Sequence, residues 1–375
     1  MALDHRVERT DQAFRDLPSL GKASSIVVKR KRYRCRNCGA TFLLPLKEMD
    51  ERRQMTARLV DWIKRESIKR TFASIAAEAG VDEKTVRNLF HEYTDELAKQ
   101  YNPLKPKWLG LDEIHLIRKP RAIITNLETR TVVEMLKDRE KATLEAYFAT
   151  WGWPDLWSVK VVAMDMWRPY RDLASKAFPQ ATLVVDKFHV LRLTNFCMDQ
   201  IRKEVKGELP HADRRSLRKD RFILLRRTKE LSMKEVLFKD MWLASLPDLA
   251  EAYRLKEAFY DIYDASSRAL AERLYENWKE SIPPGRVKTA FTPLLMACKN
   301  WHAEIFNYFD HRQTNATTEA LNSLVRHAHR AGRGYSFEAI RAKMLYREGV
   351  RLRRKPPRMP PVDARRMYET IDLLG

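Results

Sequence analysis

The chain has 375 residues, 44% of them hydrophobic, which is enough for two or three folded units with substantial cores and excludes a largely disordered protein. Lys and Arg number 71 against 50 Asp and Glu, so the formal net charge is +21. A surplus of this size favours a polyanionic partner such as nucleic acid, although ribosomal and membrane-surface proteins share it.

The sequence carries no signal for secretion or membrane insertion. Its first 16 residues are polar, and no stretch approaches the roughly 20 apolar residues that cross a bilayer. Two of the four cysteines, Cys197 and Cys298, stand alone, which fits a reducing compartment and not a disulfide scaffold. We therefore expect a cytoplasmic protein with no membrane partner.

Residues 1–50 are predicted to form a small basic unit. They contain Cys35 and Cys38 in the order Cys-Arg-Asn-Cys-Gly, and six Lys or Arg with no acid over residues 28–36. A second basic run, from residue 326 to 358, holds eleven Lys or Arg against two Glu. Such runs are often solvated helix faces or disordered tails. Because aromatic and apolar residues interleave the charges, binding to nucleic acid is the favoured interpretation.

Residues 51–100 are predicted to be helical and to contain a helix-turn-helix. The segment 71–93 reads as a helix, a turn that contains a glycine, and a second helix that Asp82 is placed to cap. Lys84 and Arg87 are expected to point outward from this second helix as DNA contacts. An ordinary helical hairpin is the alternative. The residues expected to line the buried faces are Ile75, Ala76, Ala79, Val86, Leu89 and Phe90.

An α/β unit is predicted from residue 106 to 358, after a Pro-containing link. Three short apolar or alternating runs, at 108–117, 121–129 and 130–138, predict strands joined by hairpins. A helix at 139–150, a strand at 159–165, a helix at 167–178 and a strand at 181–186 are expected next. This is the order of a ribonuclease-H-like fold, although order alone does not give function. A large helical insertion is expected at about 200–305, and residues 359–375 are expected to form a tail.

Acidic residues lie at or near the ends of the predicted strands. Asp112 lies within the first strand, Asp165 ends the fourth and Asp186 ends the fifth. A single Asp in such a place is more often a turn or cap residue than a catalyst. Three of them on neighbouring strands would repel one another unless a cation neutralised them, and hard oxygen ligands select Mg²⁺ or Mn²⁺. The pattern therefore points to a cleft that binds divalent metal.

Glu319 is the candidate for a third ligand, far downstream in the sequence. Residues 315–318 predict the start of a helix that packs on the sheet. The side chains expected on its polar edge, where a metal ion and a phosphate would meet, are Glu319, Asn322, Arg326 and Arg330. Those expected in its buried stripe are Leu321, Leu324, Val325 and Ala328. A solvated amphipathic helix with incidental charges is the alternative.

The blocks GLDEIHL, VVAMDMWRPY, VVDKFHVLR and TNATTEALNSLVRHAHRAGRGYSFEAIRAKMLYR resemble those of ISL-three-type bacterial insertion-sequence transposases. The resemblance covers nearly the whole chain, and its most specific part runs from TNATTEALN to RGYSFEAIRAK. It implies a catalytic triad of Asp112, Asp165 and Glu319. Asp186 and His189 match an Asp-x-x-His signature of several related transposase groups, and are expected to support the site.

The resemblance implies a transposase that binds the terminal inverted repeats of its element through separate amino-terminal units. It would then cut the ends and join them to target DNA with two Mg²⁺ or Mn²⁺ ions. A homo-oligomer is expected, because two ends must be brought together, acting in the cytoplasm on nucleoid DNA. A helix-turn-helix regulator without chemistry and a structure-specific nuclease on the same fold remain alternatives.

The amino-terminal unit has fewer candidate zinc ligands than a complete zinc ribbon needs. The family's zinc ribbon uses two Cys-x-x-Cys knuckles, whereas this chain has one, formed by Cys35 and Cys38. His5 is the other good candidate ligand before them. Because tetrahedral Zn²⁺ needs four ligands, the sequence predicts only a zinc-ribbon-like remnant.

Overall fold

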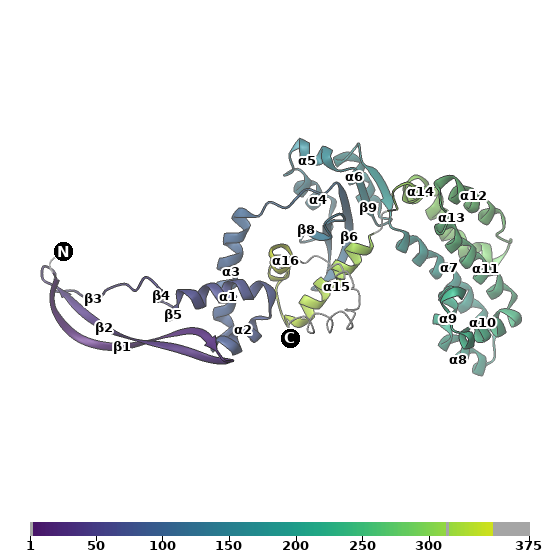
Figure 1. Ribbon diagram of the computed structural model, residues 1–375. Coiled ribbons are helices and arrows are strands. Elements are labelled where there is room, and N and C mark those ends of the chain that lie inside the picture. Colours follow the sequence, from purple (N-terminus) through teal and green to yellow (C-terminus); the bar gives the residue numbers. More distant parts are fainter. Residues whose placement is uncertain (1–2, 313–314, 348–375) are drawn as a thin grey trace, which may run out of the picture.

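The computed structural model describes the backbone of residues 3–312 and 315–347 and the side chains from residue 10 onward. The chain is elongated (Figure 1), with an arm of strands and three helices at one end, a sheet flanked by helices in the middle, and a helical lobe at the other end. None of the helices in these ranges is long and apolar enough to cross a membrane.

The arm is a long hairpin that the sequence did not predict. Strand β1 (Leu3–Ser19) pairs antiparallel with β2 (Lys22–Cys35), and the turn at Leu20 and Gly21 has positive φ at both residues. Three short strands complete this sheet in the order β3-β2-β1-β5-β4, namely β3 (Thr41–Leu43), β4 (Met49–Asp50) and β5 (Met55–Thr56). The basic run at 28–36 therefore lies mostly on an exposed β-ribbon.

Helices α1 (Ala57–Lys69), α2 (Phe72–Ala79) and α3 (Glu83–Gln100) follow the arm. Gly80 ends α2 with a left-handed φ of 66°, and a Cβ there would lie 2.9 Å from that of Ala23 near the hairpin tip. Asp82 is the N-cap of α3 as predicted, but its side chain makes no capping hydrogen bond. The six apolar residues predicted to be buried between α2 and α3 are all buried.

The central sheet has the strand order β10-β9-β6-β7-β8. Strands β6 (Trp108–Leu116), β7 (Lys119–Asn126) and β8 (Thr131–Met135) form an antiparallel meander, while β9 (Val161–Met164) and β10 (Thr182–Val185) run parallel to β6. Helices α4 (Lys141–Phe148), α5 (Trp153–Ser158) and α6 (Arg168–Ala177) connect them. All five predicted strands are present, so this part of the chain is a mixed α/β unit.

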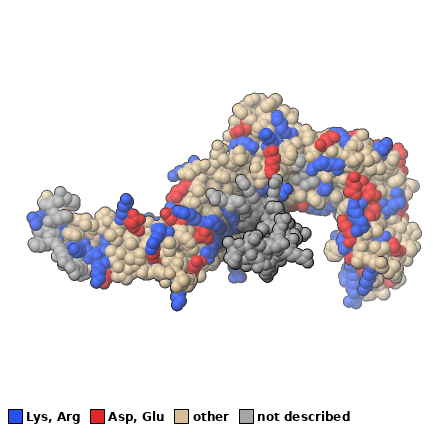
Figure 2. All heavy atoms as spheres, viewed as in Figure 1, with Lys and Arg blue, Asp and Glu red and all other residues tan. Residues whose placement is uncertain are grey.

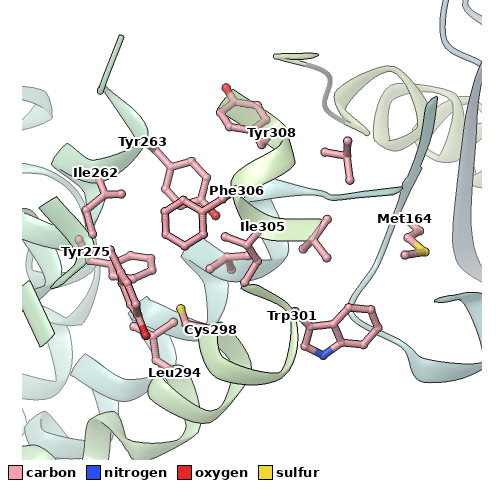
Figure 3. Packing of buried hydrophobic residues seen from close by; sticks show 14 of the residues in the cluster. Met164, Ile262, Tyr263, Tyr275, Leu294, Cys298, Trp301, Ile305, Phe306 and Tyr308 are labelled. Carbon is pink, nitrogen blue, oxygen red and sulfur yellow. The ribbon is translucent and has the colours of Figure 1, made fainter. Parts of the chain in front are cut away.

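A helical lobe follows β10. Its helices are α7 (Lys187–Glu208), α8 (His211–Lys219), α9 (Arg221–Leu225), the 3-10 turn η1 (Thr228–Glu230), α10 (Met233–Ser245), α11 (Pro247–Tyr263), α12 (Arg268–Glu280), α13 (Arg286–Asn300) and α14 (His302–His311). Figure 3 shows its core running from Tyr263 of α11 through Phe306 of α14 to Met164 of β9. Figure 2 shows basic side chains gathered at its tip, over α8.

Two helices, α15 (Ala316–Ala331) and α16 (Phe337–Tyr346), return to the central sheet and the amino-terminal helices. The predicted stripe of α15 is partly wrong, because Leu324 is exposed while Asn322 and Thr318 are buried. The helix packs on the sheet through a row that includes polar side chains, since these find hydrogen-bond partners there. Asn322 therefore does not share the exposed edge with Arg326 and Arg330.

One hydrophobic core joins the helix-turn-helix to the central sheet. It contains Phe72 and Phe90 of α2 and α3, Ile123 of β7, and Val325 and Ile340 of α15 and α16. The amide of Phe72 also donates to the hydroxyl of Tyr335, 2.9 Å away. The helix-turn-helix is therefore packed directly on the central unit, because apolar side chains from both parts are buried together.

Candidate active site

Strand register places three acids in a row. Leu111 of β6 and Val185 of β10 both lie opposite Met164 of β9, so the residues that follow them, Asp112, Asp165 and Asp186, are neighbours across three adjacent strands. Strands β9 and β10 end at this row while β6 continues to Leu116, so the acids lie at the carboxyl ends of two parallel strands, where ligands sit in open α/β sheets.

Asp112 is buried and held from two sides. Its carboxylate accepts from the amide of Glu113 at 2.7 Å and from Nδ2 of Asn322 at 2.9 Å. Burial raises the pKa of Asp112 to about 6, and the carboxylates of Asp165 and Asp186 add to this rise. The repulsion among the three acids that the sequence predicted is therefore present at this edge.

His189 of α7 is paired with Asp165. Its Nδ1 lies 2.9 Å from Oδ1 of Asp165. Although burial opposes both shifts, this contact lowers the pKa of Asp165 and raises the pKa of His189. The histidine thus fixes the orientation of the carboxylate and offsets part of the negative charge.

Asp186 is fully buried and connects two helices to the sheet edge. It is the N-cap of α7, where its Oδ1 accepts from the amide of Phe188 at 3.4 Å, and it also accepts from the backbone of Asn315. Burial raises its pKa. Among the described residues, its Oδ2 has no hydrogen-bond partner.

The start of α15 is fixed against β6 and β7 by buried polar groups. Asn315 donates through Nδ2 to the carbonyl of Leu111 at 3.1 Å, and the hydroxyl of Thr318 lies 2.7 Å from that of Thr125. Gly110 makes this approach possible, because a Cβ there would lie 2.3 Å from Oγ1 of Thr125 and 2.7 Å from Oγ1 of Thr318. Sequence analysis missed this network, although the conspicuous TNATTE block supplies two of its members.

Glu319 lies one residue beyond Thr318 and is more exposed than the three aspartates. Its side chain is 40% exposed, and its Oε1 lies 3.8 Å from Nη2 of Arg192 on α7. Asn322, one turn later on α15, reaches Asp112. Arg326 and Arg330 are exposed, and none of the described contacts connects them to the acids.

Comparison with known proteins decides the family. Residues 109–344 match a family described as "Transposase", of the ISL3 type, and residues 45–94 match the "Helix-turn-helix domain of transposase family ISL3". The first match alone covers more than half of the chain. The chain belongs to the ISL3 transposase family. It is also 22% identical over 333 residues to the transposase for insertion sequence element IS1001 of Bordetella parapertussis, covering 88% of this chain and 82% of that protein.

Transposases of this type generally use divalent metal ions, and the donor set at the sheet edge suits them. Carboxylate oxygens are the ligands that Mg²⁺ and Mn²⁺ prefer, and Asp112 and Asp165 lie close enough on adjacent strands for the charge of one to raise the pKa of the other. Within 3–312 and 315–347, however, no three His, Cys, Asp or Glu side chains are grouped so that they would hold a metal ion. Glu319 contacts Arg192, and its charge also contributes to the raised pKa of Asp186, after the larger effect of burial.

The DNA-binding domain presents a hollow of about 810 Å³ beside α3. Thr85, Asn88 and His91 of α3 line one side, and Arg15 and Arg52 contribute from the arm and from the segment before α1. Sequence analysis did not single out these five residues. The two residues that it chose as DNA contacts, Lys84 and Arg87, are exposed on α3, and Arg87 pairs with Glu83 at 3.0 Å.

Cys35, the last residue of β2, contacts Cys38 in the turn that follows the strand. Backbone amides at Cys38 and Asn37 lower the pKa of the Cys35 thiol. No group of three or more His, Cys, Asp or Glu among the described residues gathers around them to hold Zn²⁺. The side chain of His5 lies outside the described part of the chain.

Proposed function

We propose that this transposase cuts DNA at the ends of its insertion sequence and joins those ends to target DNA, with Asp112, Asp165 and Glu319 as the ligands of two divalent ions. We also propose that the central unit is a ribonuclease-H-like domain. An antiparallel meander whose first strand, β6, is continued on its other side by the parallel strands β9 and β10 supports that fold.

One observation carries the proposal. The hydrogen bond from Asn322 to Asp112 joins residues 210 positions apart, and it brings the helix of Glu319 to the row of acids on β6, β9 and β10. The formation of these strands and of α15 does not itself require that Asp112 and Asp186 be buried beside the amide of Asn322. A shared catalytic site does explain it.

The metal ions would lower the pKa of the attacking water or 3′-hydroxyl and stabilise the leaving oxygen of the phosphodiester. The chain's own groups position the ligands: Asn322 orients Asp112, and His189 orients Asp165. Arg192, at 3.8 Å from Glu319, supplies a cation beside the place where a DNA phosphate would lie.

End recognition would fall to the helix-turn-helix and the basic arm. Lys84 and Arg87 are exposed on α3 for contact with the terminal inverted repeat. Because two ends must be joined to one target, the active form would be a homo-oligomer that binds two repeats.

The test is the variant Glu319→Gln of the full chain, assayed for cleavage and strand transfer on the element's own inverted repeats in Mg²⁺. Glutamine keeps the shape and removes the charge, so we expect a loss of about 3 kcal/mol or more of transition-state stabilisation with little change in binding to the repeat. Partial rescue by Mn²⁺ is expected.

Glu280→Gln, on the far helix α12, is the matched control and should cut normally. If Glu319→Gln cuts at the wild-type rate, the triad assignment is wrong. Wild-type protein that binds the repeat without cutting would favour the regulator. Wild-type protein that cuts branched DNA without preferring the repeat would favour the nuclease.

A further inference from the structure

We propose that the outer face of α7 binds unpaired nucleotides of the DNA strand at the active site, with bases stacked on Phe188 and Phe196 and phosphates held by Arg192 and Lys203. This inference rests on the proposed function, because it names how that site holds its substrate.

The residues of this face form one exposed row. Phe188, Arg192, Phe196 and Lys203 are the exposed residues of α7 between positions 187 and 203. The two phenylalanines are 38% and 47% exposed, and their eight-residue separation corresponds to about 12 Å along the same side of the helix.

Burial of the core does not account for these two rings. The opposite side of α7 already packs against the lobe through Val190, Cys197, Met198 and Ile201, which are all fully buried. Large aromatic side chains that remain in solvent on a helix with a complete buried face indicate a surface that is covered in another state.

The charges beside the rings favour nucleic acid as the occupant. Nζ of Lys187 lies 5.4 Å from the ring of Phe188, and Nζ of Lys203 lies 6.0 Å from the ring of Phe196. The one acid of this stretch, Asp199, is buried and paired with Arg202 at 2.7 Å and with Lys203 at 3.3 Å, so its single charge faces two cations and leaves the face with a positive surplus. Aromatic rings alternating with cations on one track are the surface that single strands use, since bases stack on the rings and phosphates contact the cations.

The row begins at the active site. The N-cap of α7 is Asp186, His189 on an adjoining face contacts Asp165, and Arg192 contacts Glu319. A strand whose phosphate lies at the acids therefore meets Phe188 first and Phe196 two turns later. The bases must be unpaired, because the bases of a duplex are stacked on one another and do not expose their faces.

The experiment uses full-length Phe196→Ser and Phe188→Ser in EDTA, so that no cleavage occurs. The probe is a DNA duplex with a single-stranded extension that carries the fluorescent base 2-aminopurine next to the junction. We expect wild-type protein to quench the fluorophore and each variant to lose most of this quenching. Affinity for the extended probe should fall about tenfold, within the range of one base–aromatic stack, and affinity for the blunt duplex should not change.

Phe222→Ser is the matched control, because Phe222 is an exposed phenylalanine beside a cation, Arg221, on α9 in the helical lobe. It should behave as wild type, and Phe196→Trp should retain quenching.

Unchanged quenching and affinity in both serine variants would overturn the inference, and a change in oligomeric state alone would make the face a protein interface instead. Cleavage in Mg²⁺ is measured separately, so wild-type protein that quenches but does not cut would contradict the proposed function and not the stacking.

Discussion

The contacts of Asp186 distinguish its role from that of its neighbour Asp165. It is fully buried and accepts hydrogen bonds from the starts of both α7 and α15, the helices that carry His189 and Glu319. Asp165, by contrast, is half-buried and accepts from His189. These contacts favour a positioning role for Asp186, with Asp165 as the metal ligand.

Asp186→Asn should therefore reduce cleavage about 10- to 100-fold, the effect expected of a group that orients metal ligands. Asparagine keeps one carbonyl oxygen as the acceptor for both helix starts, so the fold should survive. The measurement is the single-turnover cleavage rate in Mg²⁺ beside that of Asp165→Asn, which should lose far more. Equal and complete loss in both variants would make Asp186 a metal ligand.

The candidate acids were predictable from sequence, but the residues that hold them in place were not. Asp112, Asp165 and Asp186 could be chosen because each follows or interrupts an apolar strand. The role of Asn322 could not be predicted, because helical periodicity placed this residue on the exposed polar edge of α15. In the structure its amide is buried and donates to Asp112. Arg192 had no local signal, because its contact with Glu319 depends on two helices that are 127 residues apart in sequence.

At the scale of elements, the contact between β6 and the start of α15 sets the position of Glu319. Gly110 has no side chain, so Thr318 and Asn315 approach the strand closely enough to bond with Thr125 and the carbonyl of Leu111. Glu319 follows Thr318 directly. Any displacement of this helix start moves the carboxylate relative to the aspartates.

Gly110→Ala should accordingly disturb both stability and chemistry. The new Cβ would lie 2.3 Å from Oγ1 of Thr125 and 2.8 Å from Oδ1 of Asn315, so α15 must shift, at a cost of about 1–3 kcal/mol. We expect a lower thermal midpoint and a cleavage rate reduced further than stability alone explains at a temperature where the variant is folded. Gly207→Ala, with no atom within 4 Å of its Cβ, is the control and should cut normally. Normal cleavage by Gly110→Ala would show that α15 tolerates displacement.

Elements that pack on a core were predictable, and the arm was not. Strands β6 to β10 carry apolar or alternating runs, and helices α2 and α3 carry regular apolar spacing, because each packs on a core. Strands β1 and β2 bury little apolar surface, because two of the three residues that they bury from residue 10 onward, Asp16 and Arg30, are charged, while Val27 is 61% exposed. With little apolar surface to bury, the hairpin leaves no alternating pattern in the sequence, and only the basic run was visible.

At the scale of the whole molecule, the helices of the helix-turn-helix and the central sheet share one hydrophobic core. Besides the shared core, Lys343 of α16 is buried and donates to the carbonyls of Ser67 and Arg70 at the end of α1. Its Nζ also lies 4.7 Å from the ring of Phe72 and 5.2 Å from that of Tyr335. The side chain of Lys343 on α16 thus supplies hydrogen bonds to the free carbonyls at the end of α1. It connects the last described helix of the chain to the amino-terminal helices.

Lys343→Met tests this coupling, because methionine fills similar space and cannot donate to the two carbonyls. Burial lowers the pKa of Lys343 to about 7, so removing the amine also relieves a desolvation cost. We expect the loss of both hydrogen bonds and of the cation–ring contacts to dominate, leaving the carbonyls unpaired and lowering the free energy of unfolding by about 1–3 kcal/mol.

Calorimetry should show the helix-turn-helix and the sheet unfolding in one transition in the wild type. In Lys343→Met this transition should move to lower temperature or separate into two, with weaker binding to the inverted repeat. Lys99→Met, at an exposed site near the end of α3, should leave both unchanged. A Lys343→Met protein as stable as wild type would show that the apolar core alone holds the two parts together.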